Sequence, residues 1–237
     1  MERLKANPQS IKRIYLQENQ ADALFIRKKA KEHGIPVVTV PRSRMIKVGR
    51  DIRTQGILVE IEDFRYVPYE AMLETALKEK HSLVFLDNLN DPQNLGVMMR
   101  SMACLGGFSI VLPTHESVGV TEAVLRVATG GDNYVSVARV MNLSRAVTVA
   151  KETGFWMAGA VTQNGRPLIE ATLPFPLGLV VGSEHKGIRD ILRKQLDLEL
   201  TIPMAQLGLS LNAAQATTIL CYEIARQRKQ RRKENQT

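Results

Sequence analysis

The feature that most constrains the fold is a repeated alternation of short apolar strands and helical segments between residues 82 and 229. Segments such as Ser82–Leu86 (SLVFL) and Gly178–Val181 (GLVV) are apolar at nearly every position. Strands have this composition when both faces of their sheet are covered, as in parallel sheets whose strands are joined by helices. We therefore predict an α/β fold with a parallel sheet. The expected strands are 82–86, 109–112, 134–138, 156–161, 178–181 and 199–202, and the expected helices are 94–106, 121–129, 143–153, 188–194 and 212–229.

A smaller α/β unit precedes this region. β-Branched apolar segments and helical spacing predict a strand–helix alternation over 11–16, 21–33, 36–40, 42–48 and 56–62. The polar, helix-prone stretch 65–80 is typical of a connector. We expect a first domain over residues 1–62, a linker over 63–81 and a second domain over 82–237. The second domain ends in a basic tail, 226–233, which we expect to fray.

The basic residues are gathered at the two ends of the chain. The formal net charge is +8 and the isoelectric point is about 9.6. Residues 1–62 hold 13 Lys and Arg against 7 Asp and Glu, and residues 226–237 hold 6 against 1, whereas the middle of the chain is slightly acidic. Such a distribution indicates binding to nucleic-acid phosphates. The alternative is two solvated surfaces that keep the protein soluble.

Several classes of protein are disfavoured by what the sequence lacks. No apolar run reaches the ~18–20 residues of a membrane helix, and the first residues form no apolar leader, so we expect a cytoplasmic protein without a membrane partner. The two cysteines, Cys104 and Cys221, have apolar neighbours and cannot build a disulfide framework. The four histidines are isolated, so no metal site is expected. Phosphate loops of the dinucleotide-binding and nucleoside-triphosphate types, and the hydrolase nucleophile elbow, are absent from the sequence.

Ligands bind at the carboxyl ends of strands in open parallel sheets, so the strand-to-helix junctions are the places to search. The first unusual junction is DNLNDPQNLG, which begins at Asp87. Asp91 and Asn94 are suited to cap a helix that Pro92 starts. Arg100 follows on a helix that is otherwise apolar, where a charge needs a partner or a function. The alternative is an arginine that snorkels to solvent or pairs with a carboxylate.

The second and third junctions flank the last predicted strand. Gly182 ends a buried strand and allows a close approach to its backbone, and Glu184 and Gly187 shape the following turn. The alternative to a binding site is a purely structural tight turn whose charged side chains are solvated. The third junction, 201–212, leads into the last helix, where Ser210 or Asn212 could simply be a cap.

Taken in this order, the three junctions resemble the three motifs of the SpoU (TrmH) family of RNA ribose 2′-O-methyltransferases. The resemblance covers roughly residues 82–228. Residues 1–62 more weakly resemble the ribosomal-protein-like substrate-binding domain of the bacterial 23S rRNA guanosine methyltransferases. His185 and Gln215 differ from the residues usual in the family. The matching residues are Asn94, Gly96 and Arg100; Gly182, Glu184 and Gly187; and Ile202, Pro203, Met204, Ser210, Leu211 and Asn212.

The resemblance implies a fold, a cofactor and partners. The second domain would be a SPOUT methyltransferase domain with a C-terminal trefoil knot, and two copies would form a homodimer through the knotted region. The cofactor would be S-adenosyl-L-methionine and the substrate structured RNA, with 23S rRNA ahead of tRNA. The resemblance further implies catalytic roles for Arg100, Asn94, Glu184, Ser210 and Asn212, and cofactor-binding roles for Gly182, Ser183, Ile202, Pro203, Met204 and Leu211.

Two other classes of function remain open at this stage. One is a catalytically inactive RNA-binding or ribosome-assembly protein of the same fold, which the presence of Asn94, Arg100, Glu184 and Asn212 disfavours. The other is a nucleotide-dependent α/β enzyme with a basic tail, which the missing phosphate loops disfavour. Calorimetry with the cofactor distinguishes all three.

Overall fold

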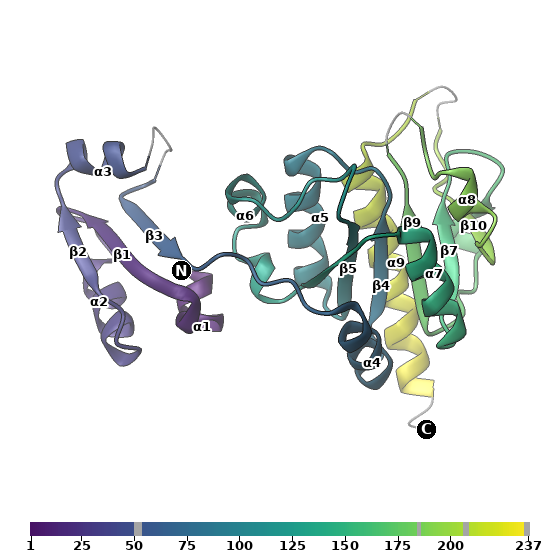
Figure 1. Cartoon of the computed structure of the whole chain (residues 1–237), viewed down its shortest axis with the longest axis horizontal. Coiled ribbons are helices and arrows are strands. Elements are labelled where there is room, and N and C mark those ends of the chain that lie inside the picture. Colours follow the sequence, from purple (N-terminus) through teal and green to yellow (C-terminus); the bar gives the residue numbers. More distant parts are fainter. Residues whose placement is uncertain (50–53, 184–185, 206–208, 235–237) are drawn as a thin grey trace. The chain divides into compact units, whose positions relative to one another are not determined.

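The chain forms two compact units, Met1–Phe64 and Arg65–Thr237, in the computed structural model (Figure 1). The structure describes residues 1–49, 54–183, 186–205 and 209–234. Each unit has its own cluster of buried apolar side chains. The two units are therefore described separately.

The first unit is a small sheet with helices. Strand β1 lies in the middle, parallel to β2 and antiparallel to β3, so the sheet is mixed. Its core is formed by side chains such as Ile14, Leu16 and Ile26, which are almost fully buried. The predicted strand–helix alternation is confirmed, and the short first helix is an addition to it. The elements are α1 (Glu2–Ala6), η1 (Pro8–Ser10), β1 (Ile11–Gln17), α2 (Ala23–Glu32), β2 (Val37–Val40), α3 (Arg42–Val48) and β3 (Ile57–Ile61).

The second unit is built on a seven-stranded sheet whose order is β6-β5-β4-β9-β7-β10-β8. Every neighbouring pair in it is parallel, as the continuous apolar strands predicted. Because all strands point the same way, their carboxyl ends meet at one edge. The strands are β4 (Ser82–Leu86), β5 (Phe108–Pro113), β6 (Ser136–Val140), β7 (Trp156–Ala160), β8 (Arg166–Pro167), β9 (Leu177–Val181) and β10 (Leu198–Thr201). Strand β8 is not among the strands that we expected.

Helices connect the strands and cover the sheet. Helix α5 packs against α6 and α9, whereas α4, α7 and α8 contribute to a separate apolar cluster with the central strands. The two sets give the covered sheet that the sequence predicted. The helices are α4 (Tyr69–Glu79), α5 (Pro92–Leu105), α6 (Glu122–Ala128), α7 (Leu143–Glu152), α8 (Asp190–Arg193) and α9 (Ala213–Glu234), with 3-10 turns η2 (Gly131–Asn133) and η3 (Leu168–Glu170).

The stretch 63–81, which we expected as a linker, is largely helix α4 and belongs to the second unit. Its apolar face buries Tyr69, Met72 and Leu73 in the core next to the sheet. The hydroxyl of Tyr69 donates a hydrogen bond of 2.7 Å to the carbonyl of Ala146 on α7. The polar composition of this stretch reflects only the exposed face of an amphipathic helix.

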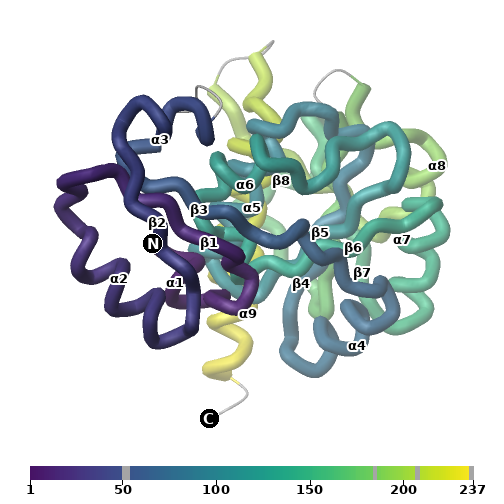
Figure 2. Tube along the Cα trace, turned by 60° about the vertical axis from the view of Figure 1, so that its left-hand side comes forward, coloured from purple at the N-terminus to yellow at the C-terminus, as the bar shows by residue number. Residues whose placement is uncertain are grey.

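The basic tail does not fray where we expected it to. Helix α9 continues to Glu234 and runs down the unit to the end where α4 lies (Figure 1); its last turns are the yellow tube in Figure 2. Arg228 is only 9% exposed and donates hydrogen bonds to the carbonyls of Gly106 and Gly107. Its guanidinium also lies over the ring of Phe108, 4.8 Å from the centroid. These contacts hold the last turns of the helix against the amino end of the sheet.

The described residues include no helix that is both long and apolar enough to cross a membrane. Cys104 and Cys221 are both free thiols. Cys221 is buried, as its apolar neighbours predicted, and burial raises the pKa of its thiol to about 12. Cys104 is exposed, because its position on α5 faces away from the sheet.

Candidate active site

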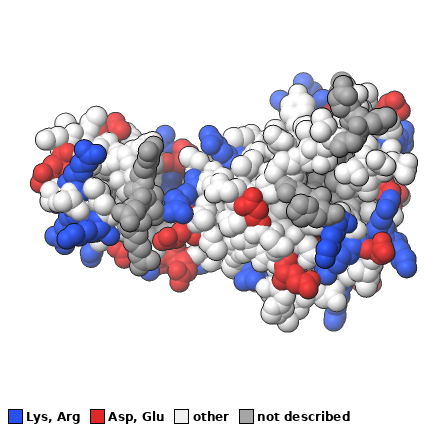
Figure 3. Space-filling model, turned by 90° about the horizontal axis from the view of Figure 1, so that it is seen from above, with Lys and Arg blue, Asp and Glu red and all other residues white. Residues whose placement is uncertain are grey.

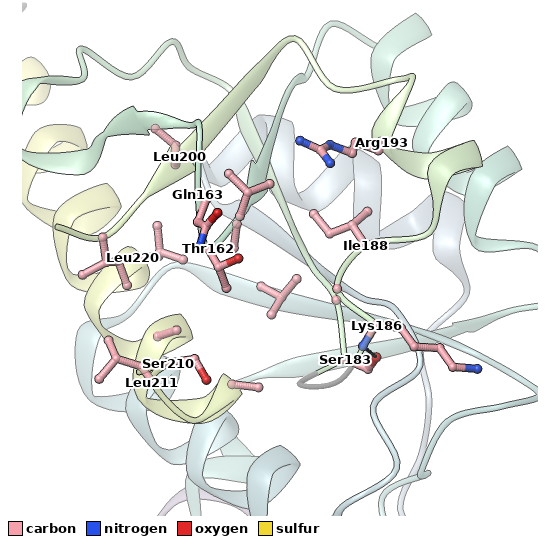
Figure 4. Close-up of a pocket in the computed structure, with 18 of the residues that line it drawn as sticks. Thr162, Gln163, Ser183, Lys186, Ile188, Arg193, Leu200, Ser210, Leu211 and Leu220 are labelled. Atoms are coloured by element: carbon pink, nitrogen blue, oxygen red, sulfur yellow. Dashed lines mark hydrogen bonds between the residues drawn. The ribbon is translucent and has the colours of Figure 1, made fainter. Parts of the chain in front are cut away.

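A cavity of about 460 Å³ opens at the carboxyl ends of β7, β9 and β10 (Figure 4). This is the edge where the strand direction predicted a site. The second and third motifs, which are separated by some twenty residues in the chain, face each other across it. The lining residues are Ala160, Val161, Thr162, Gln163, Asn164, Val181, Gly182, Ser183, Lys186, Gly187, Ile188, Arg193, Leu200, Ile202, Met204, Ser210, Leu211, Ala213, Ala216 and Leu220.

Gly182 shapes the turn that forms one wall of the cavity. A Cβ atom at position 182 would lie 2.1 Å from the carbonyl carbon of Gly187 and 2.3 Å from the amide nitrogen of Ile188. We expected a close approach to this backbone, and the group that approaches is the chain's own turn. The amide of Gly187 donates to the carbonyl of Ser183 over 2.9 Å, and the amide of Lys186 donates to the Ser183 hydroxyl over 3.2 Å. The glycine thus permits a folded-back backbone rather than leaving an open slot.

A buried carboxylate fixes the end of the same turn. Asp87, at the carboxyl end of β4, is 0% exposed. It accepts a hydrogen bond of 3.0 Å from the amide of Arg189 and forms an ion pair of 2.7 Å with the guanidinium of that residue. Arg189 also lies 3.5 Å from the carboxylate of Glu116. A buried charge that is paired in this way holds the turn in one position relative to the sheet.

The third motif supplies the opposite wall. Ile202, Met204, Ser210 and Leu211 all line the cavity, as the resemblance implied. Pro203 does not belong to the lining, although both of its described neighbours in the chain do. Figure 4 shows Ser210 and Leu211 on one side of the cavity, across from Ser183. The resemblance therefore identified most of this wall correctly.

Asn212 links this wall to the first motif. Its side-chain oxygen accepts a hydrogen bond of 2.8 Å from the amide of Ala214. Asn212 therefore caps α9, which is the alternative role that the sequence suggests for it. Its side-chain nitrogen also donates to the side-chain oxygen of Asn94 over 2.9 Å. One asparagine thus performs both tasks, and it brings together residues that are 118 positions apart.

The residues of the first motif have different structural roles. Asp91 caps α5 by accepting a hydrogen bond of 2.8 Å from the amide of Gln93. Asn94 is only 6% exposed and does not cap the helix; it faces Asn212. Gly96 lies where α5 crosses α6, since a Cβ atom there would come within 2.5 Å of Val127. The glycine of this motif is explained by helix packing.

Arg100 corrects one expectation from the sequence. We placed it inside an apolar helix, but its position on α5 is exposed, and the buried apolar residues Met98, Met99 and Met102 occupy the other faces of the helix. Its guanidinium donates a long hydrogen bond of 3.5 Å to the hydroxyl of Thr129. It is not among the residues that line the cavity. Within one chain, the structure joins Asn94 and Asn212 but leaves Arg100 at the surface.

The candidate residue Glu184 lies outside the described residues, as does His185, which differs from the residue usual in the family. In contrast, Thr162, Gln163 and Asn164 line the cavity and were not identified from the sequence. They follow β7, and Thr162 and Gln163 point into the middle of the cavity in Figure 4. A signal was available, because a polar loop directly after a parallel strand lies at the binding edge of the sheet.

The cavity fits S-adenosylmethionine in size and character. Its volume lies within the range of small-molecule sites, and its lining combines apolar side chains with a few hydroxyl and amide groups. Of the two lining cations, Arg193 is already paired with Glu199 over 2.8 Å, and Lys186 points away from the cavity in Figure 4. The described residues contain no group of three His, Cys, Asp or Glu side chains that could hold a metal ion.

Comparisons with known proteins agree with this geometry. Residues 81–222 match the model of the SpoU rRNA methylase family, and residues 1–67 match that of the RNA 2′-O ribose methyltransferase substrate-binding domain. A Synechocystis tRNA/rRNA methyltransferase is 37% identical over 84% of this chain, which spans about half (52%) of that relative. A 23S rRNA (guanosine-2′-O-)-methyltransferase from Coxiella burnetii is 32% identical over 95% of this chain and 91% of its own length.

A solved structure shares the fold. The rRNA methyltransferase of Sinorhizobium meliloti, determined with bound AdoMet, has a TM-score of 0.78 and 22% identity over 95% of this chain and 84% of that one. The family match covers more than half of the chain and includes all three junctions. The chain therefore belongs to the SpoU (TrmH) family of S-adenosylmethionine-dependent RNA 2′-O-methyltransferases, and it carries the family's RNA substrate-binding domain ahead of the catalytic one.

Proposed function

We propose that this enzyme methylates a ribose 2′-hydroxyl of 23S rRNA. The observation that carries the proposal is the cavity whose two walls are the second and third motifs, joined to the first motif by the bond between Asn94 and Asn212. The relative from Coxiella burnetii, which aligns over nearly the whole chain, is named for 23S rRNA. The Synechocystis relative is named for tRNA or rRNA, so tRNA is the second candidate substrate.

The chain's own residues have to hold the reactants and help remove a proton. S-adenosylmethionine supplies an already activated methyl group when bound. Backbone near Gly182, Ile202 and Leu211 would hold its adenine and methionine parts, with Ser183, Pro203 and Met204 beside them. Small and apolar residues suffice where the backbone itself makes the polar contacts. The reacting ribose would then lie at the open side of the cavity.

Ser210 and Asn212 are assigned to the reacting centre, and Asn94 to positioning Asn212. Arg100 would fix the phosphate and ribose of the substrate, and Glu184 would pair with Arg100 or with the RNA. An ordinary guanidinium has a pKa above ~12, which suits a group that positions anions better than one that removes protons. The rate enhancement then comes mainly from orientation of the 2′-hydroxyl.

A homodimer would place Arg100 next to a second copy. The exposed face of α5 carries Val97 one turn before Arg100, and the neighbouring helix α9 exposes Ile219 and Tyr222. Apolar side chains at 39–59% exposure on two packed helices form a surface suited to association. We assign this face, next to the expected trefoil knot, to the dimer interface. Sedimentation of Tyr222→Arg should show monomers where the wild type shows dimers.

We assign the first unit to RNA binding. Its residues 1–62 carry a net charge of +6, whereas the middle of the chain is slightly acidic. A chain that begins at Arg65 should bind RNA more weakly, with a flatter salt dependence, because each lost phosphate contact lowers the slope by about 0.7–0.9. The cut belongs at Arg65 because α4 is part of the second core. Equal affinities and slopes for the long and short chains would exclude the first unit as the RNA-binding domain.

The activity is tested with labelled S-adenosylmethionine, 23S rRNA and tRNA, followed by mapping of 2′-O-methyl groups. The wild type should label one ribose, and Arg100→Ala should retain the fold and the affinity for S-adenosylhomocysteine while losing about 10² in rate or more. Wild-type rates for Arg100→Ala would refute its role. Cofactor binding without methyl transfer to either RNA would favour the inactive RNA-binding alternative.

A further inference from the structure

A second cavity lies at the opposite end of the sheet. It has a volume of about 280 Å³, and its lining comes from the end of α4, the segment before β9 and the last turns of α9. The ends of α4 and α9 lie together in Figure 1, and a hydrogen bond from Arg232 to the carbonyl of Glu79 joins them. The lining residues of this amino-end cavity are Leu77, Lys80, His81, Phe175, Pro176, Arg228, Arg231 and Arg232.

The amino-end cavity concentrates positive charge without an equivalent negative charge. Arg228 is buried, and it donates hydrogen bonds to neutral groups: the carbonyls of Gly106 and Gly107 and, at 3.4 Å, the hydroxyl of Ser82. Arg232 donates to a carbonyl oxygen, that of Glu79, over 2.8 Å. A buried guanidinium whose hydrogen-bond partners are all neutral keeps an uncompensated positive charge, which attracts any anion that can reach it.

Two further cations at this cavity are free to bind a ligand. Within the described part of the chain, the side chains of Lys80 and Arg231 have no hydrogen-bond or ion-pair partner. A carboxylate close by, that of Glu79, is half exposed and lies 3.2 Å from the imidazole of His81. By contrast, Lys and Arg lie among Asp and Glu over the opposite end of the unit, which Figure 3 shows.

The remaining lining is apolar. Leu77, Phe175 and Pro176 lie next to the cations, so the cavity offers a hydrophobic surface beside a cluster of donors. A free inorganic ion would use only the donors. A nucleotide within a strand uses both, since its phosphate binds the cations and its ribose or base rests on apolar and aromatic side chains. The volume is suited to one such unit.

We propose that the amino-end cavity binds a phosphate, with its adjoining nucleoside, of the RNA strand that the enzyme methylates. This inference rests on the proposed function, because it takes the bound strand to be the substrate. It extends the RNA path on the catalytic unit from the cofactor edge to the far end of the sheet. Lys80 and Arg231 contact the phosphate, and Arg228 supplies the fixed positive charge behind them.

The test compares two double variants of the full chain. Lys80→Gln with Arg231→Gln removes both free cations but spares Arg228, whose loss would disturb the fold. Arg145→Gln with Lys194→Gln is the matched control. Both residues are exposed, at α7 and the end of α8, and their side chains have no hydrogen-bond or ion-pair partner among the described residues. The probe is a fluorescent single-stranded oligouridylate of about ten nucleotides, titrated over a series of salt concentrations.

The variant with Lys80→Gln and Arg231→Gln, here called the pocket variant, should bind the oligonucleotide about fivefold more weakly. Its slope of log affinity against log salt should be smaller by about 0.7, the value of one phosphate on a single strand. The control should stay close to the wild type. Affinity for S-adenosylhomocysteine should be unchanged in both, because the first cavity lies at the other end of the strands. Equal losses in the two double variants would show a general charge effect and overturn the proposal.

A second arm separates a strand phosphate from a free one. The imidazole resonances of His81 are followed while inorganic phosphate is added to the wild type. The pKa of His81 is lowered, mainly by burial and also by Arg228 and Arg232, while Glu79 partly offsets this effect. A bound anion stabilises the protonated imidazole, so it should raise this lowered pKa. A phosphate response without loss of oligonucleotide affinity in the pocket variant would overturn the assignment to RNA. Absence of methyl transfer by the wild type, with both binding effects intact, would refute the proposed function and not the site.

Discussion

The two ends of the catalytic sheet are built on different principles. At the carboxyl end, the cavity walls are turns whose shape depends on small residues, short polar side chains and the ion pair of the fully buried Asp87 with Arg189. At the amino end, a single long side chain, Arg228, holds a helix terminus by binding carbonyls. The comparison indicates that the cavity at the carboxyl end depends mainly on the shape of the backbone, whereas the amino end depends mainly on charged side chains. The predictions below test that separation.

The largest effect is expected at the amino end. Arg228→Ala removes the guanidinium hydrogen bonds to the carbonyls of Gly106 and Gly107 and the contact with Phe108, so we expect a loss of about 3 kcal/mol in the free energy of unfolding. Affinity for S-adenosylhomocysteine, measured below the new melting temperature, should not change. Lys229→Ala is the neighbouring exposed control and should stay within about 0.5 kcal/mol of the wild type. A stable Arg228→Ala variant would contradict the anchoring role.

The next effect belongs to the carboxyl end. Gly182→Ala forces the turn at Gly187 and Ile188 to move, because the added Cβ atom would overlap their backbone. Overpacking of this kind costs about 1–3 kcal/mol, and calorimetry should show a drop of at least tenfold in affinity for S-adenosylhomocysteine. Gly182→Val should abolish binding.

Gly187→Ala provides the graded control for this position. A Cβ atom there would meet open space, but the residue has a φ of +67°, so the cost is conformational and of the order of 1 kcal/mol. Its effect on the affinity should be smaller than that of Gly182→Ala. Equal affinities for the wild type and Gly182→Val would place the cofactor elsewhere.

A smaller effect tests the bond that joins the first and third motifs. Asn94→Ala and Asn212→Ala should each lower stability or cofactor affinity, and the double variant should lose less than the sum, with a coupling of about 0.5–1.5 kcal/mol. Asn212→Ala should cost more than Asn94→Ala, since it also removes the cap of α9. Strict additivity would mean that the two side chains act independently.

The smallest effect is a pH dependence at the amino end. Burial and the nearby Arg228 and Arg232 lower the pKa of His81 below its ordinary 6.5. The folded state therefore binds this proton less tightly than the unfolded state does, and stability that is present above pH 6.5 is lost as the pH falls through the lowered pKa. Urea denaturation between pH 7.5 and 5 should show a shallower decline in His81→Gln than in the wild type. Identical pH profiles would show that His81 does not contribute.

The order of strands and helices could be predicted because the signals are local. Continuous apolar strands, turn residues and helical spacing determined a covered parallel sheet, and the three motifs determined the family and most of the cavity wall. The errors share a cause. Arg100 and the basic tail were judged by composition, but exposure depends on which face of a helix meets the rest of the fold. Likewise, the helix over Tyr69–Glu79 looked like a linker until its apolar face met the sheet.

Only the tertiary structure decided which distant residues meet. The contact of Asn94 with Asn212, the ion pair of Asp87 with Arg189 and the hold of Arg228 on Gly107 join residues more than 100 positions apart. No local pattern encodes such pairs, because each residue also satisfies a local role, as the capping by Asn212 shows. The sequence by itself determined the elements and the family. The packing of the sheet and helices decided where the cavities lie and which side chains face them.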